Sequence, residues 1–211
     1  MSCLLHPTYF PNVFHFAVIQ AYKGQVTWEV HDHFQKQTFR NRCEICADSG
    51  KLKLSAPIIH KKKREHQKFS EIELEYKTLW YRIHWKSITT AYRSSPYFEF
   101  YEDELNTIFE KKYNTLMELN LNSIRFFAKQ LNLQLDETYS KHFNLESDDD
   151  DFRFLVNAKY KLKFTAPQYT QVFGDRHGFI ENASMLDLLF NLGPNAQDYL
   201  SQIDIKALKN G

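Results

Sequence analysis

The sequence predicts an α/β fold for the chain of 211 residues. A helix-periodic segment at about 11–22 lies between strand-like runs at 2–6 and 25–31, which is typical of a parallel β-α-β unit. The turn sequence Asp-Ser-Gly at 48–50 separates two further strand-like runs, as in antiparallel hairpins. We therefore expect a central mixed sheet with parallel first and second strands, an antiparallel hairpin at about 39–59, and flanking helices.

The first strand runs into the hexapeptide His-Pro-Thr-Tyr-Phe-Pro at 6–11. Pro7 lacks an amide donor and pushes His6 towards extended backbone, whereas Pro11 suits the first turn of a helix. Free backbone amides and the positive end of the helix dipole converge at such a strand–turn–helix junction. This is a favoured ligand position in α/β proteins, so we expect a binding site here whose ligand the sequence does not identify.

Apolar spacing and turn residues place the remaining elements within one domain, 1–211, that has a helical segment at about 78–133. The further strands are expected at 39–46, 52–59 and 71–76, and the further helices at 78–93, 101–111, 113–131 and 184–192. Gly-Pro at 193–194 ends the last helix. The acidic run at 147–151 is expected to be an exposed turn or helix cap rather than a metal site, because consecutive side chains diverge.

The composition excludes several classes of function. With 6 glycines the chain has neither a Walker-type nor a GxGxxG phosphate loop, and a net charge of +1 argues against nucleic-acid binding. No apolar run approaches about 18 residues, so no membrane insertion is expected. The basic run at 60–68 is interpreted as a solvated loop, with an anionic partner as the alternative. The sequence does not predict the oligomeric state.

The three cysteines, an odd number without a preceding signal peptide, favour a reducing cytoplasmic location. Cys43 and Cys46 have the CxxC spacing of redox and zinc sites, but on a strand their thiols face opposite sides, so structural thiols are favoured. Glu29, His31 and His33 share one face of an extended strand. That face suits a metal, an acid/base or substrate-binding pair, or a structural role. We expect neither a metal nor a cofactor.

Two residues of the hexapeptide are candidates for catalysis. His6 suits a general acid or base or a phosphate donor, or alternatively a structural cap on a backbone carbonyl. Tyr9 suits a hydrogen bond to a ligand, or alternatively a contact that fixes the turn to the core. No serine or cysteine nucleophile motif decides between an enzyme and a binding protein.

Cationic residues near the hairpin are the best binding candidates. On an extended strand Arg40 and Arg42 project to the same side, and guanidinium groups suit bidentate contact with a carboxylate or phosphate. With Lys36 they favour recognition of a small anion over a structural ion pair. Asn41 faces the other way and is expected to tie down the neighbouring loop.

Asp187 lies in the apolar helix expected at 184–192, where a buried carboxylate needs a partner. Pairing with Arg40 or Arg42 is the expected solution. If Ser184 is the N-cap, Asp187 falls at the third helical position, where a carboxylate reaches back to the cap amide. Both roles stabilise the fold, so we expect Asp187 to be structural.

Short motifs follow one another along the chain in an order that resembles one family. They are His-Pro-Thr-Tyr-Phe-Pro at 6–11, Glu-Val-His at 29–31, Phe-Gln-Lys-Gln-Thr-Phe-Arg-Asn-Arg-Cys at 34–43, Leu-Ser-Ala-Pro-Ile at 54–58, Trp85, Ala-Tyr-Arg-Ser-Ser-Pro-Tyr-Phe at 91–98, and Asn-Ala-Ser-Met-Leu-Asp-Leu-Leu-Phe-Asn at 182–191. Over about residues 3–201 the chain thereby resembles the WbqC-like family, in particular its Bacteroidetes branch. His6 stands where the family often has glutamine.

The resemblance implies a class of function. Family members are associated with bacterial surface-polysaccharide (O-antigen-type) gene sets, which implies a cytoplasmic transferase that binds an anionic nucleotide-sugar or activated acyl donor. The alternative is a non-catalytic ligand-binding or scaffold protein on a nucleotidylyltransferase-like core. The turn also resembles the Gly-Thr-Phe-Asp-Pro-x-His-x-Gly-His signature of nucleotidylyltransferases, with Pro7 in place of the glycine, the first histidine absent and His15 at the second.

Overall fold

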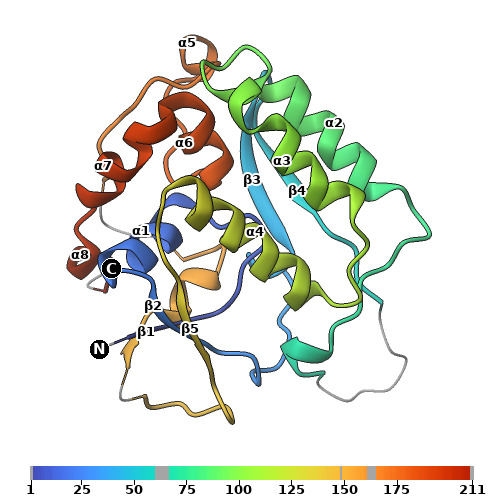
Figure 1. Cartoon of the computed structure of the whole chain (residues 1–211), viewed down its shortest axis with the longest axis vertical. Coiled ribbons are helices and arrows are strands. Elements are labelled where there is room, and N and C mark those ends of the chain that lie inside the picture. Colours follow the sequence, from blue (N-terminus) through green and yellow to red (C-terminus); the bar gives the residue numbers. More distant parts are fainter. Residues whose placement is uncertain (1, 60–66, 148, 161–164, 210–211) are drawn as a thin grey trace.

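The computed structural model describes residues 2–59, 67–147, 149–160 and 165–209 (Figure 1). Its centre is a four-stranded parallel sheet in the order β5-β2-β1-β6. The strands are β1 (Cys3–Leu5), β2 (Gln25–Trp28), β5 (Asp136–Tyr139) and β6 (Asp150–Asp151). β1 is buried along its whole length, as expected for an interior parallel strand that is covered on both faces.

Helix α1 (Val13–Ala21) connects β1 to β2 and confirms the expected parallel β-α-β unit. Asn12 is its N-cap, so Pro11 precedes the helix instead of forming its first turn. The return to β2 passes through Gly24, which has a φ of +79°. An added Cβ there would lie 2.0 Å from the Gln134 carbonyl oxygen, so the close approach of the two backbones requires glycine.

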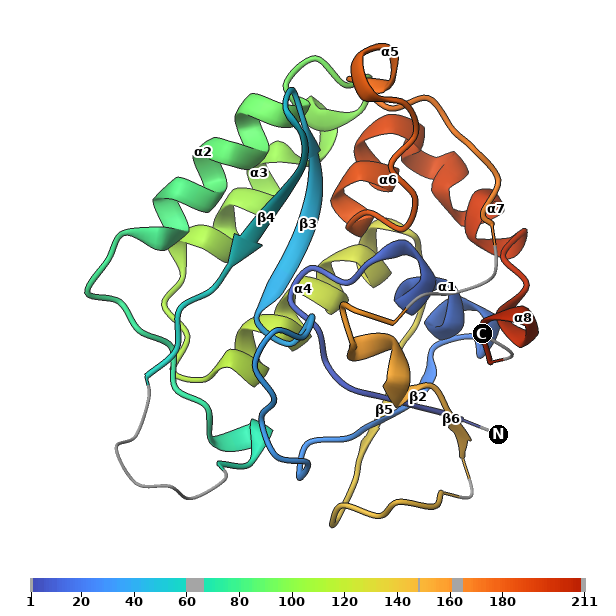
Figure 2. The same ribbon diagram turned by 180° about the vertical axis from the view of Figure 1, so that it is seen from behind.

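Strands β3 (Arg42–Ala47) and β4 (Gly50–Ser55) form the expected antiparallel hairpin. The α/β architecture is confirmed, but this hairpin is a two-stranded sheet of its own and does not join the parallel strands. Figure 2 shows it between two groups of helices, and β3 contacts both α2 (Trp80–Tyr92) and α6 (Met185–Leu192). The hairpin is therefore held as an inner layer, with its preceding segment directed towards the parallel sheet.

The helices expected within 78–133 and at 184–192 are confirmed as α2, α3 (Phe98–Glu110), α4 (Leu116–Gln130) and α6. Thr115 and Glu118 form a capping box at the start of α4. The sequence did not predict the short helices α5 (Gly174–His177), α7 (Ala196–Ser201) and α8 (Ile205–Lys209), nor the 3₁₀ turns Phe69–Glu71, Arg153–Val156 and Gly193–Asn195. None of the described helices is both long and apolar enough to cross a lipid bilayer.

Two expected elements are wrong. Residues 71–76 form no strand, and Leu74 makes only an isolated bridge with Ile58. The acidic run is not simply a turn, because Asp150–Asp151 extends as β6 beside β1. Its charge is compensated there, since Lys209 Nζ lies 2.6 Å from an Asp150 carboxylate oxygen. Asp148 and most of the basic run, 60–66, lie outside the described residues.

Candidate functional site

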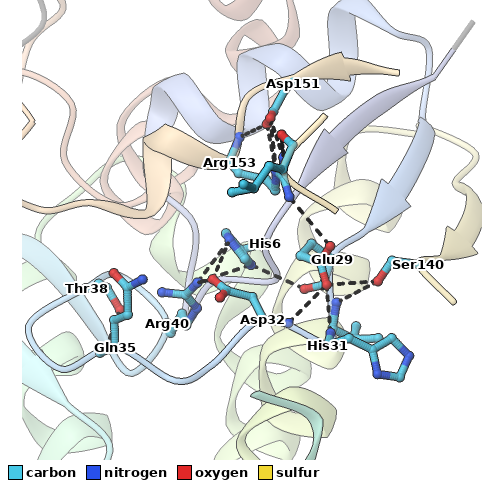
Figure 3. Close-up of polar contacts among 12 residues, drawn as sticks. His6, Glu29, His31, Asp32, Gln35, Thr38, Arg40, Ser140, Asp151 and Arg153 are labelled. Atoms are coloured by element: carbon cyan, nitrogen blue, oxygen red, sulfur yellow. Dashed lines mark hydrogen bonds and ion pairs between the residues drawn. The ribbon is translucent and has the colours of Figure 1, made fainter. Parts of the chain in front are cut away.

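The candidate site lies at the C-terminal ends of the parallel strands. β1 pairs with β2 on one side and with β6 on the other, so the strand order reverses at β1. Ligands in open α/β sheets bind outside the carboxyl ends of the strands at such a point. Figure 3 shows His6 after β1, Glu29 after β2 and Arg153 after β6 facing this region.

A buried ionic cluster joins His6 to the segment between β2 and β3. Arg40 Nη2 donates a hydrogen bond to Asp32 Oδ2 at 2.5 Å and lies 3.0 Å from His6 Nε2 (Figure 3). The same Asp32 oxygen is 3.4 Å from His6 Nε2. All three side chains are buried, so the guanidinium and carboxylate compensate each other's charge away from water. We call His6, Asp32 and Arg40 the strand-end cluster.

His6 is neutral in this cluster. Burial lowers its pKa well below the usual value, and the nearby Arg40 cation lowers it further. His6 Nδ1 lies 3.3 Å from the Glu29 carbonyl oxygen, which only accepts hydrogen bonds, so we assign the ring proton to Nδ1. Nε2 then accepts a hydrogen bond from Arg40 Nη2 at 3.0 Å. Because burial and the Arg40 cation lower its pKa, this imidazole is a weak base in the conformation of the structure.

The hydrogen bonding around Arg40 is incomplete. Within the described part of the chain, Arg40 Nε and Nη1 are buried without a partner, as are Thr8 Oγ1 and Asn120 Oδ1. The Asn120 amide nitrogen donates to the carbonyl oxygens of Arg40 at 2.7 Å and Pro7 at 3.0 Å, so these residues meet at the turn after β1. Buried polar atoms without partners are rare and call for an explanation such as bound water or a ligand.

Glu29 ends β2. Its Oε1 accepts hydrogen bonds from the amides of His31 at 2.7 Å and Asp32 at 3.1 Å, and from Ser140 Oγ at 3.0 Å. The carboxylate thereby turns the chain immediately after the strand and brings Asp32 back towards Arg40. His31 is therefore not on a strand, and the expected shared face of Glu29, His31 and His33 is wrong.

Arg153 anchors the loop between β5 and β6. Its guanidinium bonds both carboxylate oxygens of Asp151 and donates to the carbonyl oxygens of Asn144 at 2.6 Å and Leu145 at 2.9 Å. Arg153 Nη1 also lies 3.7 Å from Glu29 Oε2. One cation thus holds β6, the loop and the end of β2 in a fixed arrangement.

A cationic depression opens beside the hairpin, with a volume of about 500 Å³. We call it the hairpin depression; it is lined by Phe34, Lys36, Gln37, Asn41, Arg42, Lys53, Ser55, Ala56, Pro57 and Ile58. This lining includes three cations and no carboxylate. Among the described residues, no hydrogen bond or ion pair engages the charged groups of Lys36, Arg42 or Lys53. The arrangement suits a small anion.

The predicted binding residues are divided between these two places. Arg40 precedes β3 and turns inward to His6, whereas Arg42 begins β3 and lines the hairpin depression. The expectation that Arg40 and Arg42 share a side is wrong, because strand alternation starts only at Arg42. Lys36 and Asn41 line the same depression as Arg42, so the expectation that Asn41 faces away from Arg42 is wrong. Asn41 Nδ2 donates to Ala56 O at 3.1 Å, which ties the start of β3 to the segment after β4.

Tyr9 does not reach the strand-end cluster. Its hydroxyl lies 2.9 Å from His84 Nδ1, and its ring packs edge-on against Trp80. The side chain is fully buried, and burial raises the pKa of the phenol well above its usual value. Two roles were possible for Tyr9, and these contacts match the structural one, in which Tyr9 fixes the turn to the aromatic core.

The start of α1 offers no free amides to a ligand. Its first three amides donate to the chain itself: Val13 to Ala183 O, Phe14 to Asn182 Oδ1 and His15 to Asn12 Oδ1. The expectation that free amides at the start of this helix bind a ligand is therefore wrong. His6, in the same strand–turn–helix junction, does face the candidate site. The His15 ring lies elsewhere, stacked on Trp28 with both ring nitrogens unpartnered within the described chain.

No group of three or more histidine, cysteine or acidic side chains among the described residues is placed to hold a metal ion. His31 is half-buried and His33 is exposed. Cys43 and Cys46 are free, buried thiols, and burial raises the pKa of each. Such thiols are poorly reactive, because the thiolate is the nucleophile and the metal ligand.

Asp187 is fully buried, but none of the arginines that the structure describes pairs with it. Its Oδ2 accepts hydrogen bonds from Tyr169 Oη at 2.6 Å and Gln171 Nε2 at 2.7 Å, and burial raises its pKa. The expected ion pair with Arg40 or Arg42 is wrong. Ser184 is the N-cap, as expected, but its hydroxyl accepts from the Leu186 amide and Asp187 does not complete a capping box.

Sequence reasoning missed Asp32 and Arg153. Asp32 stands between His31 and His33, and the sequence pattern assigns a role to these two histidines and none to Asp32. The signal that identifies it is the carboxylate of Glu29 three residues earlier, which is placed to cap a turn. Arg153 follows the acidic run that is expected to be an exposed turn or helix cap, and no local sequence pattern pairs it with the loop between β5 and β6.

Comparison with known proteins gives two findings. The model of the WbqC-like protein family matches residues 6–161. A Mycobacterium tuberculosis protein described as "Uncharacterized protein Rv1507c" is 25% identical over 205 residues, covering 81% of this chain and 86% of that protein. No solved structure matches the chain.

Proposed function

The chain belongs to the WbqC-like protein family, and on that premise we propose that it is a cytoplasmic transferase of bacterial surface-polysaccharide biosynthesis. Its donor carries an anionic group, as a nucleotide-linked sugar or an activated acyl compound does, and this group binds in the hairpin depression. The single observation behind the proposal is that the cations of Lys36, Arg42 and Lys53 line one hollow without a compensating carboxylate. The free, buried thiols suit a reducing compartment.

The charge pattern favours an anionic group over a neutral ligand. Three unpaired cations in one concave surface repel one another, and a bound phosphate or carboxylate relieves that repulsion while accepting several donors. Phe34, Pro57 and Ile58 supply apolar contacts for a non-ionic part of the same ligand. A volume of about 500 Å³ falls within the usual range of small-molecule sites.

In this proposal His6 accepts a proton from the attacking group of the acceptor. Its imidazole is neutral, and Arg40 and Asp32 fix its ring. Transfer of a proton to Nε2 requires that the Arg40 hydrogen bond to this atom is released. One observation favours the second candidate, a non-catalytic ligand-binding protein: only 3% of His6 is exposed, so the ring is not open to a substrate in this conformation.

Thermal shift with a nucleotide series tests the anion site. Phosphorylated nucleotides should raise the melting temperature of the protein, and the unphosphorylated nucleoside should not. Arg42→Gln should weaken phosphate binding about tenfold, corresponding to about 1.4 kcal/mol. The matched control is Lys51→Gln, because Lys51 is on the same hairpin but pairs with Glu44 and lies outside the depression. Equal loss in both variants, or no nucleotide effect, would contradict the proposal.

A second variant separates the two candidates. For a transferase, His6→Gln should retain nucleotide stabilisation and lose turnover of an activated donor. For a binding protein, neither the parent nor the variant turns over the donor, while both bind it.

A further inference from the structure

A second depression lies over the parallel sheet beside Glu29. Its volume is about 690 Å³, and we call it the sheet depression. It is lined by Leu4, Thr27, Glu29, Ser140, Lys141, His142, Asn144, Glu146, Ser147 and Asp149. Strands β1 and β2 contribute its floor, and the loop that Arg153 anchors forms its wall.

The lining of the sheet depression has the opposite charge to that of the hairpin depression. Glu29, Glu146 and Asp149 supply three carboxylates, against the single lysine Lys141. Hydroxyl and amide groups make up most of the remainder. A ligand here meets acceptors for N–H and O–H groups, and an anion meets net repulsion.

Glu29 provides an acceptor oxygen that the described residues engage only through a long ion pair. Its Oε1 receives three hydrogen bonds, whereas Oε2 receives none from the described residues and has only Arg153 Nη1 at 3.7 Å. Glu29 is 1% exposed, so this oxygen is largely removed from water while its residue lines the hollow. A buried carboxylate oxygen with unmet capacity favours a positively charged donor.

We propose that the sheet depression binds a hydroxylated ligand that carries a primary amine, that is, an amino sugar, with its ammonium group on Glu29 Oε2. Its hydroxyl groups bond the polar side chains of the loop and of Thr27. As the subsite of the acceptor, this inference rests on the proposed transferase function. As a binding site, it stands on the lining alone.

Protein-observed NMR with three probes tests the proposal. Glucosamine should shift the amide signals of Thr27 and of the loop from Ser140 to Asn144, glucose should do so more weakly, and glucuronate should not. Glu29→Gln should weaken glucosamine binding about tenfold and abolish its advantage over glucose. Lys141→Gln is the matched control, because it removes the opposite charge from the same lining and should not weaken glucosamine binding.

A further variant keeps the test decisive if Glu29→Gln disturbs the turn after β2. Thr27→Leu fills the floor from a half-exposed position on the sheet face and should abolish glucosamine binding in a folded protein. The proposal would be overturned if glucuronate bound as strongly as glucosamine, or if glucosamine did not shift the amide signals of Thr27 and of the loop. Full glucosamine binding by Glu29→Gln or by Thr27→Leu would also overturn it. The phosphate response of the same samples reports on the hairpin depression, so failure of one site is distinguishable from failure of the other.

Discussion

Two buried carboxylates in this protein are stabilised in opposite ways. Asp32 in the strand-end cluster pairs with a cation, Arg40, at 2.5 Å. Among the described residues, the donors to the carboxylate of Asp187 on α6 are neutral and include Tyr169, Gln171 and Asn191. Both are removed from water, so burial of a charge does not by itself separate a site from a structural element.

The surroundings of Asp32 and Asp187 differ in how completely their polar atoms are hydrogen-bonded. Around Asp187, Tyr169 and Gln171 satisfy one another and the carboxylate. Around Asp32, two Arg40 nitrogens remain without a partner among the described residues. Cores tolerate few unsatisfied polar atoms, whereas functional sites keep them for a ligand or for strain. The comparison therefore favours the strand ends over α6 as the place where a ligand would bind.

The largest expected effect comes from removing the cation of the strand-end cluster. Arg40→Met leaves the Asp32 carboxylate buried without compensation, which should lower the free energy of unfolding by about 3–5 kcal/mol. Denaturant unfolding measures it. The double variant Asp32→Asn, Arg40→Met should recover much of the loss, because the uncompensated charge is gone. If Arg40→Met alone were as stable as the parent, the ion pair between Asp32 and Arg40 would not be buried as described.

The second effect tests Asp187 as a structural residue. Asp187→Asn places an amide nitrogen among donors and should lower the free energy of unfolding by about 1–3 kcal/mol. Nucleotide affinity of the folded protein should stay unchanged. If this variant melts like the parent but no longer binds, the contrast between the two carboxylates fails.

The pH dependence of stability tests the buried histidines. Burial lowers the pKa of His15 to about 3 and that of His84 to about 4. Unfolded chains protonate near pH 6.5 while the folded state does not, so the stability present above that pH is lost as the pH falls. Each such histidine should cost about 1.4 kcal/mol per pH unit below 6.5, until its folded pKa is reached.

Asp187 opposes this trend, because its raised pKa lets the folded state bind a proton before the unfolded state does. Unfolding curves from neutral to acid pH should therefore fall less steeply in the parent than in Asp187→Asn. Stability that is flat from pH 7 to about pH 4.5 would mean that these histidines are already charged or exposed.

The smallest effect concerns His15. Its ring stacks on Trp28 with neither nitrogen partnered within the described chain. His15→Phe keeps the ring and removes two buried polar atoms, so it should be neutral or stabilising by about 1 kcal/mol, with a shallower acid limb. Thermal unfolding at two pH values measures both. Clear destabilisation would indicate a water-mediated bond.

Much of the fold follows from local sequence. The β-α-β unit, the hairpin and the long helices depend on apolar periodicity and on turn residues such as Gly50 and Gly193, and these signals lie within each element. The errors arise where side chains act across the chain. Glu29 ends β2 early by bonding two later amides, and Lys209 helps Asp150 to extend beside β1.

The candidate site was predictable only where its residues lie next to local sequence signals. His6 and Arg42 stand next to turn and strand signals, and the structure places both at polar features of the molecule. Asp32 and Arg153 acquire their roles only from partners that are distant in sequence or structure. The charge of Arg40 makes it a binding candidate from the sequence, but its burial beside His6 depends on the path of the segment between β2 and β3.

The most direct test of the central claim is a crystal structure of the protein with a nucleoside diphosphate such as uridine diphosphate. We predict its phosphate oxygens in the hairpin depression, in contact with the Arg42 guanidinium and the Lys53 ammonium group. Phosphates bound at the start of α1 or in the sheet depression, with the hairpin depression unoccupied, would contradict the account.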